Sequence, residues 1–174
     1  MKTRSSCLSF LLLMAIIISG CTQNKNQEQD DIAAISEFYN QYFHFLETDD
    51  LDSFMTLWDD NAMRSAPDIP NSFGKEEIRS VFKNIFDASN NKFTPIGETK
   101  LEVCGNIAYG FRTLTLTSNP KEAGTTIHVD FNVLTIFKRQ PDGSWKLYID
   151  CMNYHPTWSM DSIASELKED NPYY

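Results

Sequence analysis

Side chains able to do chemistry gather on three predicted strands near the end of the chain. Residues 107–118, 126–139 and 145–154 alternate apolar with polar residues, which is typical of strands in a sheet. Pairing these strands across their turns brings a base, an amide and two acids onto one face. These side chains are Arg112, Asp130, Asn132 and Asp150. Together they could bind a polar group on a small molecule.

The opposite face of these strands is predicted to be almost wholly apolar, and it can be covered in more than one way. If helices cover it, it is core, and the polar face is solvated surface. If the polar face lines a pocket, small Ala108 and Gly110 leave room there, and the apolar face would seal a homodimer. In that case Arg112 and Asp130 would form a partly buried pair, and Asp150 would be the freer acid. A curved sheet could also mix the two arrangements.

Other kinds of site find little support in the sequence. The three histidines, His44, His128 and His155, are scattered, and no Cys-x-x-Cys, His-x-x-x-His or glycine-rich phosphate loop occurs. We therefore predict no metal and no cofactor. The chain has a net charge of −9 and no Lys/Arg cluster, which argues against a nucleic-acid partner.

Residues 31–155 are predicted to form one domain in which helices precede strands. Apolar stripes with three- and four-residue spacing predict three helices, which begin at Asp30 or Asp31, at Asp50 and after Gly74. Beyond Asn91 the period changes to two, and four antiparallel strands are expected. This order is an α+β pattern. The expected strands are a short one at 62–66 and four longer ones at 93–104, 107–118, 126–139 and 145–154.

The first twenty residues have the composition of a bacterial export signal. Lys2 and Arg4 precede an apolar run over 8–18, which is short for a membrane span. The run ends in Ile18-Ser19-Gly20-Cys21, which resembles the lipobox of bacterial lipoproteins. We predict that residues 1–20 are removed, that Cys21 is acylated, and that residues 21–30 form a flexible tether. An ordinary secretory signal cut near Gly20 is the alternative.

The remaining cysteines are expected to be unpaired. Cys104 lies on the first long strand and Cys151 on the fourth, which is too far apart for a disulfide in a simple meander. We predict that both are buried thiols. In the tail, 156–174, a short helix after Ser159 is expected.

The order of elements resembles the SnoaL-like branch of the nuclear transport factor 2-like superfamily. The matching segments are Asp49-Asp50-Leu51, Leu57-Trp58-Asp59-Asp60-Asn61-Ala62, Phe73-Gly74-Lys75-Glu76 and the last hairpin with Asp150 and Asn153. The resemblance implies a cone-shaped, cystatin-like α+β fold: three N-terminal helices on a curved four-stranded antiparallel meander, plus a short strand or hairpin. It also implies a pocket inside the cone that Asp150 would face. Relatives include isomerases, dehydratases, hydrolases and non-catalytic proteins, so the fold alone does not assign a function.

The ketosteroid isomerases among these relatives use an aspartate base and a tyrosine donor. Aligned through the segments above, the donor position falls on Tyr42 and the base position on Ala66. A methyl group cannot accept a proton, so that mechanism is not expected here.

We therefore predict a lipid-anchored SnoaL-like domain of the bacterial cell envelope that binds a small, partly apolar molecule. Thr22 rather than an aspartate follows Cys21, which favours the outer membrane. No catalytic residue is assigned, and a homodimer through the sheet is expected. The alternatives are an acid–base isomerase, dehydratase or hydrolase that uses Asp150 with Tyr42 or His128, and an oligomerisation module. The predicted ligand contacts are Tyr42, Trp58, Arg112, Asp130, Asn132 and Asp150.

Overall fold

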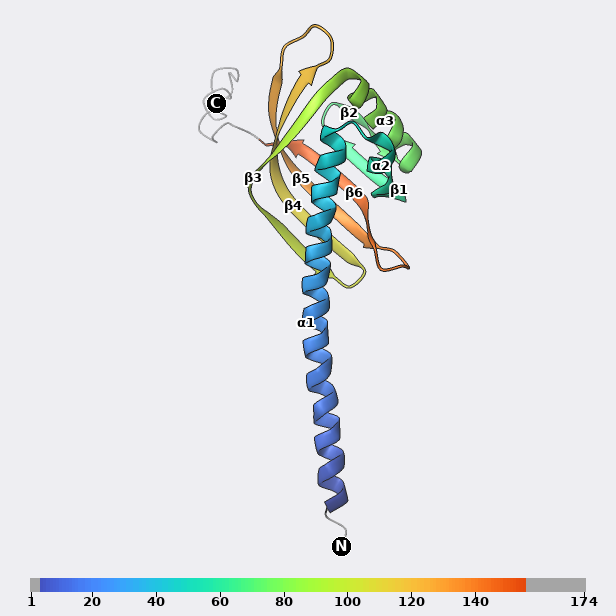
Figure 1. Ribbon diagram of the computed structural model, residues 1–174, viewed down its shortest axis with the longest axis vertical. Helices are drawn as coiled ribbons and strands as arrows, with labels where there is room; N and C mark the ends of the chain where they lie inside the picture. The colour runs from blue at the N-terminus through green and yellow to red at the C-terminus, as the bar shows by residue number, and fades with distance from the viewer. Residues whose placement is uncertain (1–3, 156–174) are drawn as a thin grey trace, which may run out of the picture.

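The computed structural model describes residues 4–155, and their side chains from Lys25 onwards. Two helices, two strands and a third helix precede the last four strands, and all six strands form one sheet in the order β2-β1-β6-β5-β4-β3 (Figure 1). Strands β1 and β6 run parallel, and the other neighbours run antiparallel. The elements are α1 (Arg4–Glu47), α2 (Leu51–Thr56), β1 (Trp58–Ala66), β2 (Ile69–Phe73), α3 (Lys75–Ala88), β3 (Ser89–Cys104), β4 (Ile107–Pro120), β5 (Ile127–Arg139) and β6 (Trp145–Tyr154).

Helix α1 is longer than the sequence predicts. It does not begin at Asp30 or Asp31, and it is helical through residues 22–29, where a flexible tether was predicted. That segment contains neither Pro nor Gly, so nothing in it interrupts a helix. The second half of α1 lies against the sheet and the first half extends away from it (Figure 1). Within the described part of the chain, no helix combines the length and apolar character needed to cross a membrane.

Asp31 fastens α1 to the far end of the sheet instead of capping a helix. Its carboxylate accepts a hydrogen bond of 2.7 Å from Arg139 Nη1 and one of 3.3 Å from Trp145 Nε1. The Arg139 hydrogen bonds lower the pKa of Asp31 below its usual range. This buried contact fixes where α1 crosses the hairpin formed by β5 and β6.

The shorter elements follow local sequence signals. Asp50 caps α2, since its Oδ1 accepts a hydrogen bond of 3.1 Å from the Ser53 amide. Strand β1 is longer than the predicted strand at 62–66, and a turn at Pro67 and Asp68 leads into β2, where a loop was expected. The turn of the last hairpin has the expected form: Gly143 has a φ of 88° and donates a 2.9 Å hydrogen bond to the Gln140 carbonyl.

The register of the sheet differs by one residue from the pairing predicted between β4 and β5. Arg112 pairs with Val133, and Thr113 pairs with Asn132. Arg112 therefore shares a face with the apolar residues of β5, whereas Thr113 and Thr115 share the other face with Asn132 and Asp130. Between β5 and β6, a bulge at Tyr148 lets both Leu147 and Asp150 face the helices. The inner face thus mixes the two predicted faces.

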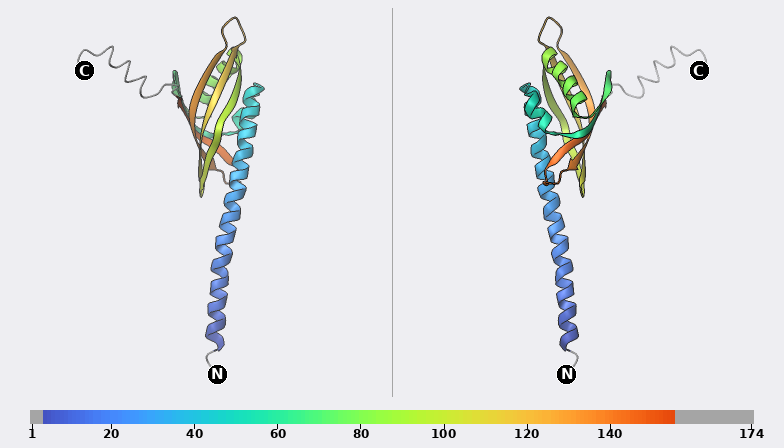
Figure 2. Two further views of the ribbon diagram at one scale, coloured as in Figure 1. Left: turned by 90° about the vertical axis from the view of Figure 1, so that its left-hand side faces the viewer. Right: turned by 90° about the vertical axis from the view of Figure 1, so that its right-hand side faces the viewer.

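Helices α1 and α3 cover this inner face, and no helix within residues 4–155 lies on the other side of the sheet (Figure 2). Phe131, Val133, Phe137 and Leu147, which were predicted to belong to an all-apolar face, are buried in the cone or its core. The uncovered face is mixed, with Phe111 and Leu134 exposed among polar side chains. The homodimer stays a prediction, without support from an all-apolar face.

The two cysteines in the sheet are free thiols, as predicted, because β4 and β5 separate their strands. The expectation that both are buried is wrong, since Cys104 and Cys151 are exposed. In the bulged register Cys151 pairs with exposed Leu134 on the uncovered face. The helix expected after Ser159 lies outside the described residues.

Candidate functional site

A cavity of about 380 Å³ lies between α1, α3 and the inner face of the sheet. Most of its wall is apolar, and Asn84 and Ala88 on α3 are lining residues that remain exposed to solvent. These two residues therefore mark its open side. The apolar wall includes Phe38, Phe43, Leu46, Ile69, Phe82, Ile85, Phe93, Leu114, Leu116, Phe131 and Val133.

Three charged side chains interrupt this apolar wall. Arg64 on β1 is the Cα partner of Asp150 on β6, and Arg112 projects from β4. Their residues are only 6%, 1% and 5% exposed, in that order. Arg64 Nε lies 3.8 Å from Asp150 Oδ2, which is an ion pair but too long for a hydrogen bond. Among the described residues, neither of these two atoms has a hydrogen-bond partner.

Burial raises the pKa of Asp150 to about 6, although Arg64 and Arg112 oppose the shift. The carboxyl group is therefore mostly ionised at neutral pH and becomes protonated in mildly acidic solution. Its orphaned Oδ2 belongs to a residue of the cavity wall. Asp150 can thus accept a hydrogen bond or a proton from a bound molecule.

Tyr39 of α1 holds Arg112 in place. Its hydroxyl bonds to Thr135 Oγ1, and Thr135 donates in turn to the Gly110 carbonyl at 3.2 Å. A Cβ at Gly110 would lie 2.2 Å from the Tyr39 hydroxyl, so only glycine leaves room for this contact. The Arg112 guanidinium lies 3.1 Å from the centroid of the Tyr39 ring, a cation–π contact. Burial lowers the pKa of Arg112, and the contacts with Tyr39 oppose that change.

Tyr42 lies one helical turn from Tyr39 and also lines the cavity. Burial, and then the charge of Asp150, raise the pKa of its phenol well above the usual range. The phenol therefore keeps its proton and can act as a hydrogen-bond donor. Trp58 is 1% exposed and packs against Phe54, Phe82 and Tyr42. It supports the wall from behind and is not a lining residue.

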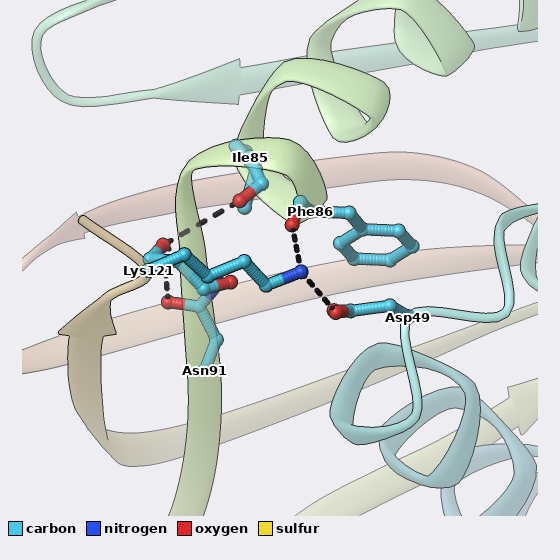
Figure 3. A network of polar contacts seen from close by, with 6 residues as sticks. Asp49, Ile85, Phe86, Asn91 and Lys121 are labelled. Atoms are coloured by element: carbon cyan, nitrogen blue, oxygen red, sulfur yellow. Dashed lines mark hydrogen bonds and ion pairs between the residues drawn. The ribbon is translucent and has the colours of Figure 1, made fainter.

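Polar contacts tie the elements together at the open side of the cavity (Figure 3). Lys121, just after β4, donates hydrogen bonds to Asp49 Oδ2 at 2.6 Å and to the Phe86 carbonyl at 2.5 Å. The nearby side chains of Ser89 and Asn91, both lining residues, bond to each other at 3.1 Å. These contacts join the turn after α1, the end of α3 and the end of β4, and so fix the width of the opening.

The match to a known family covers most of this arrangement. The SnoaL-like domain matches residues 35–149, which include both cavity arginines and end one residue before Asp150. The chain belongs to the SnoaL-like family. A comparison with curated proteins finds no match.

Solved structures show the same nuclear transport factor 2-like fold. A superfamily protein from Salmonella enterica aligns with a TM-score of 0.68 and 15% identity, over 79% of this chain and 96% of its own. A putative dehydratase from Streptomyces avermitilis aligns with a TM-score of 0.64 and 19% identity, over 74% of this chain and 98% of its own. A hexachlorocyclohexane dehydrochlorinase from Novosphingobium barchaimii aligns with a TM-score of 0.64 and 18% identity, over 74% of this chain and 88% of its own. At these identities the likeness establishes the fold.

In this SnoaL-like domain, Asp130 and Asn132 do not join the other predicted contacts. Asp130 accepts a 2.7 Å hydrogen bond from Thr115, and Asn132 accepts one of 3.0 Å from Thr113, all on the uncovered face. The predicted grouping of both residues with Arg112 is wrong, because the register places Arg112 beside Val133. Asp150 instead meets Arg64.

His128, the alternative partner for Asp150, is also outside the cavity wall. It is exposed, and its Nδ1 lies 3.0 Å from Thr117 Oγ1. By contrast, Ala66, at the position predicted for an isomerase base, does line the cavity. In the described part of the chain, no three His, Cys, Asp or Glu side chains cluster as a metal site would require.

Sequence reasoning missed Arg64 and Tyr39 as site residues. Arg64 stands between Ala62 and Ala66, so the alternation of the short strand puts an arginine and two small residues on one face. The same pattern of an arginine beside small residues marks Arg112, which follows Ala108 and Gly110. Tyr39 was hidden in the apolar stripe of its helix.

The raised pKa of Asp150 predicts how the stability of the fold depends on pH. The native state holds this proton more tightly than the unfolded state, whose pKa is near 3.8. Asp150 therefore costs stability progressively as pH rises from about 4 to about 6, by something on the order of 3 kcal/mol. Urea unfolding at several pH values measures the free energy of unfolding of wild type and of Asp150→Asn. As pH rises from about 4 to about 6, wild type should lose stability relative to the variant.

Asp130→Asn is the matched control, since it makes the same chemical change on the uncovered face. If the free energy of unfolding of each variant differed from that of wild type by an amount independent of pH, the assignment of Asp150 as a buried acid with a raised pKa would be wrong. Comparing differences between variants removes the contribution of the other carboxyl groups.

Proposed function

We propose that the protein binds a small, partly apolar molecule inside the cone, as a lipid-anchored component of the bacterial cell envelope. The observation that carries the first part is the cavity itself: about 380 Å³ enclosed by mainly apolar side chains, with Asp150, Arg64, Arg112 and Tyr42 as polar contacts. Ligand sites in proteins have this composition, an apolar wall with a few polar groups that fix orientation.

The apolar wall defines the body of the ligand. Phe43, Phe93, Leu114, Phe131 and Val133 belong to one connected group of buried and partly buried side chains. Removing apolar surface from water contributes about 25 cal/mol per Å², so a ring system placed against this group would bind mainly through burial. The ion pair of Arg64 with Asp150 fixes the polar end of the site.

A bicyclic ketone, 1-tetralone, should therefore bind to the full chain. Leu116 lines the cavity, and Leu116→Trp should fill it and weaken binding by about tenfold or more, because the ligand and the indole would compete for one space. Isothermal titration calorimetry measures both affinities.

Leu134→Trp is the control, because Leu134 is 39% exposed on the uncovered face. It should bind 1-tetralone as wild type does. Equal weakening by the two tryptophans, or binding that survives in Leu116→Trp, would place the ligand elsewhere and end the proposal.

An acid–base enzyme is the second candidate, and the state of Asp150 favours it. A carboxylate with a pKa of about 6 and a free oxygen suits a general base. It would take a proton from a carbon next to a carbonyl, while Tyr42 and the arginines face the negative charge that forms on the oxygen. A putative dehydratase and a hexachlorocyclohexane dehydrochlorinase are among the structural neighbours, which supports this candidate.

Deuterium exchange separates the two candidates with the same ligand. In D₂O, a binding protein leaves the exchange of the C2 protons of 1-tetralone at the rate of the buffer, which is the result we expect by NMR. Exchange faster than buffer, and lost in Asp150→Asn but kept in Asp130→Asn, would replace the binding proposal with the enzyme.

The envelope location is proposed from the sequence, because Ile18-Ser19-Gly20-Cys21 has the form of a lipobox. Two or three acyl chains on Cys21 would hold the protein at a membrane, since each buried methylene contributes about 0.8 kcal/mol. Wild type expressed in a bacterium should therefore fractionate with membranes and gain the mass of its lipids. Cys21→Ala should lose both properties, and an equally membrane-bound Cys21→Ala would exclude the anchor.

A further inference from the structure

The charges in the cavity wall do not balance. Among the described residues, its charged side chains are Arg64, Arg112 and Asp150, two positive groups and one negative. All three residues are at least nine-tenths buried. An uncompensated charge in an apolar surrounding is costly, so buried charges are normally paired. One positive charge in this cavity therefore lacks a partner.

Arg112 is the arginine without an acid. Asp150 lies within ion-pair distance of Arg64, whereas no described carboxylate lies within 4 Å of Arg112. Its guanidinium rests on the face of Tyr39, with Phe43 at 5.3 Å, and its Nε has no hydrogen-bond partner among the described residues. Aromatic faces stabilise the charge of a guanidinium but do not accept its in-plane N–H groups. The Nε donor of Arg112 is therefore left unused among the described residues.

We propose that the ligand of this cavity is an organic anion, with its negative group at Arg112 and Arg64 and its apolar body along the wall formed by Phe93, Leu116 and Phe131. The inference rests on the proposed function and narrows it to one chemical class. Arginine is suited to this role, because its N–H groups form a planar fork that fits carboxylate, sulfonate and phosphate oxygens. Such a ligand, together with ionised Asp150, would bring the charge of the cavity to zero.

The net charge of the protein does not attract anions, so any preference for an anionic ligand depends on the two cavity arginines. The chain has a net charge of −9, so its long-range field repels a negative solute. Preference for an anion over a neutral molecule of the same shape must therefore arise inside the cavity. There the low dielectric constant strengthens a charge–charge contact and salt screens it poorly.

The test compares two ligands that differ in charge. Naphthalene-2-sulfonate and naphthalene-2-sulfonamide have the same ring system, but only the sulfonate is ionised at pH 7. With the full chain, calorimetry should show the sulfonate binding at least about tenfold more tightly than the sulfonamide. Equal affinities, or tighter binding of the sulfonamide, would overturn the inference.

Arg112→Gln locates the preference. It removes the charge and keeps a hydrogen-bond donor, so the sulfonate should weaken to the level of the sulfonamide while the sulfonamide is little changed. Arg79→Gln is the control, because Arg79 pairs with Asp52 on the outside of α3. If Arg112→Gln does not fold, Arg64→Gln tests the same preference for the sulfonate. A preference that persists in the cavity variants would also overturn the inference.

Two further results separate this inference from the proposed function. Binding of 1-tetralone with no preference for the sulfonate would leave the cavity as a ligand site and reject the anion. Failure of all three compounds to bind would reject the site as a whole. Inorganic sulfate should compete weakly, because it lacks the apolar body, and competition as strong as that of the sulfonate would reject an organic ligand.

Discussion

The pairing of Arg112 with Val133 and of Asp150 with Thr135 determines which side chains of β4, β5 and β6 line the cavity. Side chains in a strand alternate between faces, so a shift of one residue between β4 and β5 would replace Val133 with Asn132 in the wall. Phe131 and Val133 would then be exposed to water, at a cost of about 1.5–3 kcal/mol each. The burial of these apolar side chains is therefore what holds Arg112 inside the cone.

Helix α1 depends on the same register. Gly110 and Thr135 are Cα partners, and together they receive the hydroxyl of Tyr39. With a side chain at position 110, Tyr39 would have to move, and Arg112 would lose the ring on which it rests. At the far end of the sheet, Asp31 binds Arg139 and Trp145. Two polar contacts thus fix the helix over the cavity, and the apolar stripe between them fills the space.

Most of the fold but only part of the site could be predicted from the sequence, for reasons that differ between elements. Period and turn residues are local signals, so the start of α3 and the strands of the last hairpin were predicted nearly to the residue. The cross-strand register is not local, because it depends on which residues a six-residue connection brings opposite one another. This error put Asp130 and Asn132 in the predicted site, while Arg112 and Asp150 are in the wall for reasons that include an unpredicted bulge. Arg64 was missed because β1 joins the sheet through a parallel pairing with β6. No short turn connects these two strands, so the sequence holds no local signal of their pairing.

The two candidate functions differ in where a negative charge would arise. If Asp150 removes a proton from a neutral ligand, the carboxyl group becomes neutral and the ligand negative, so the cavity keeps an excess of one positive charge throughout the reaction. If the ligand is already an anion, ionised Asp150 and the ligand together match Arg64 and Arg112, and the cavity becomes neutral. The second arrangement removes the electrostatic cost of burying an unpaired guanidinium. The same two arginines would stabilise an enolate, but only a preformed anion gives Arg112 the partner that the described part of the fold does not supply.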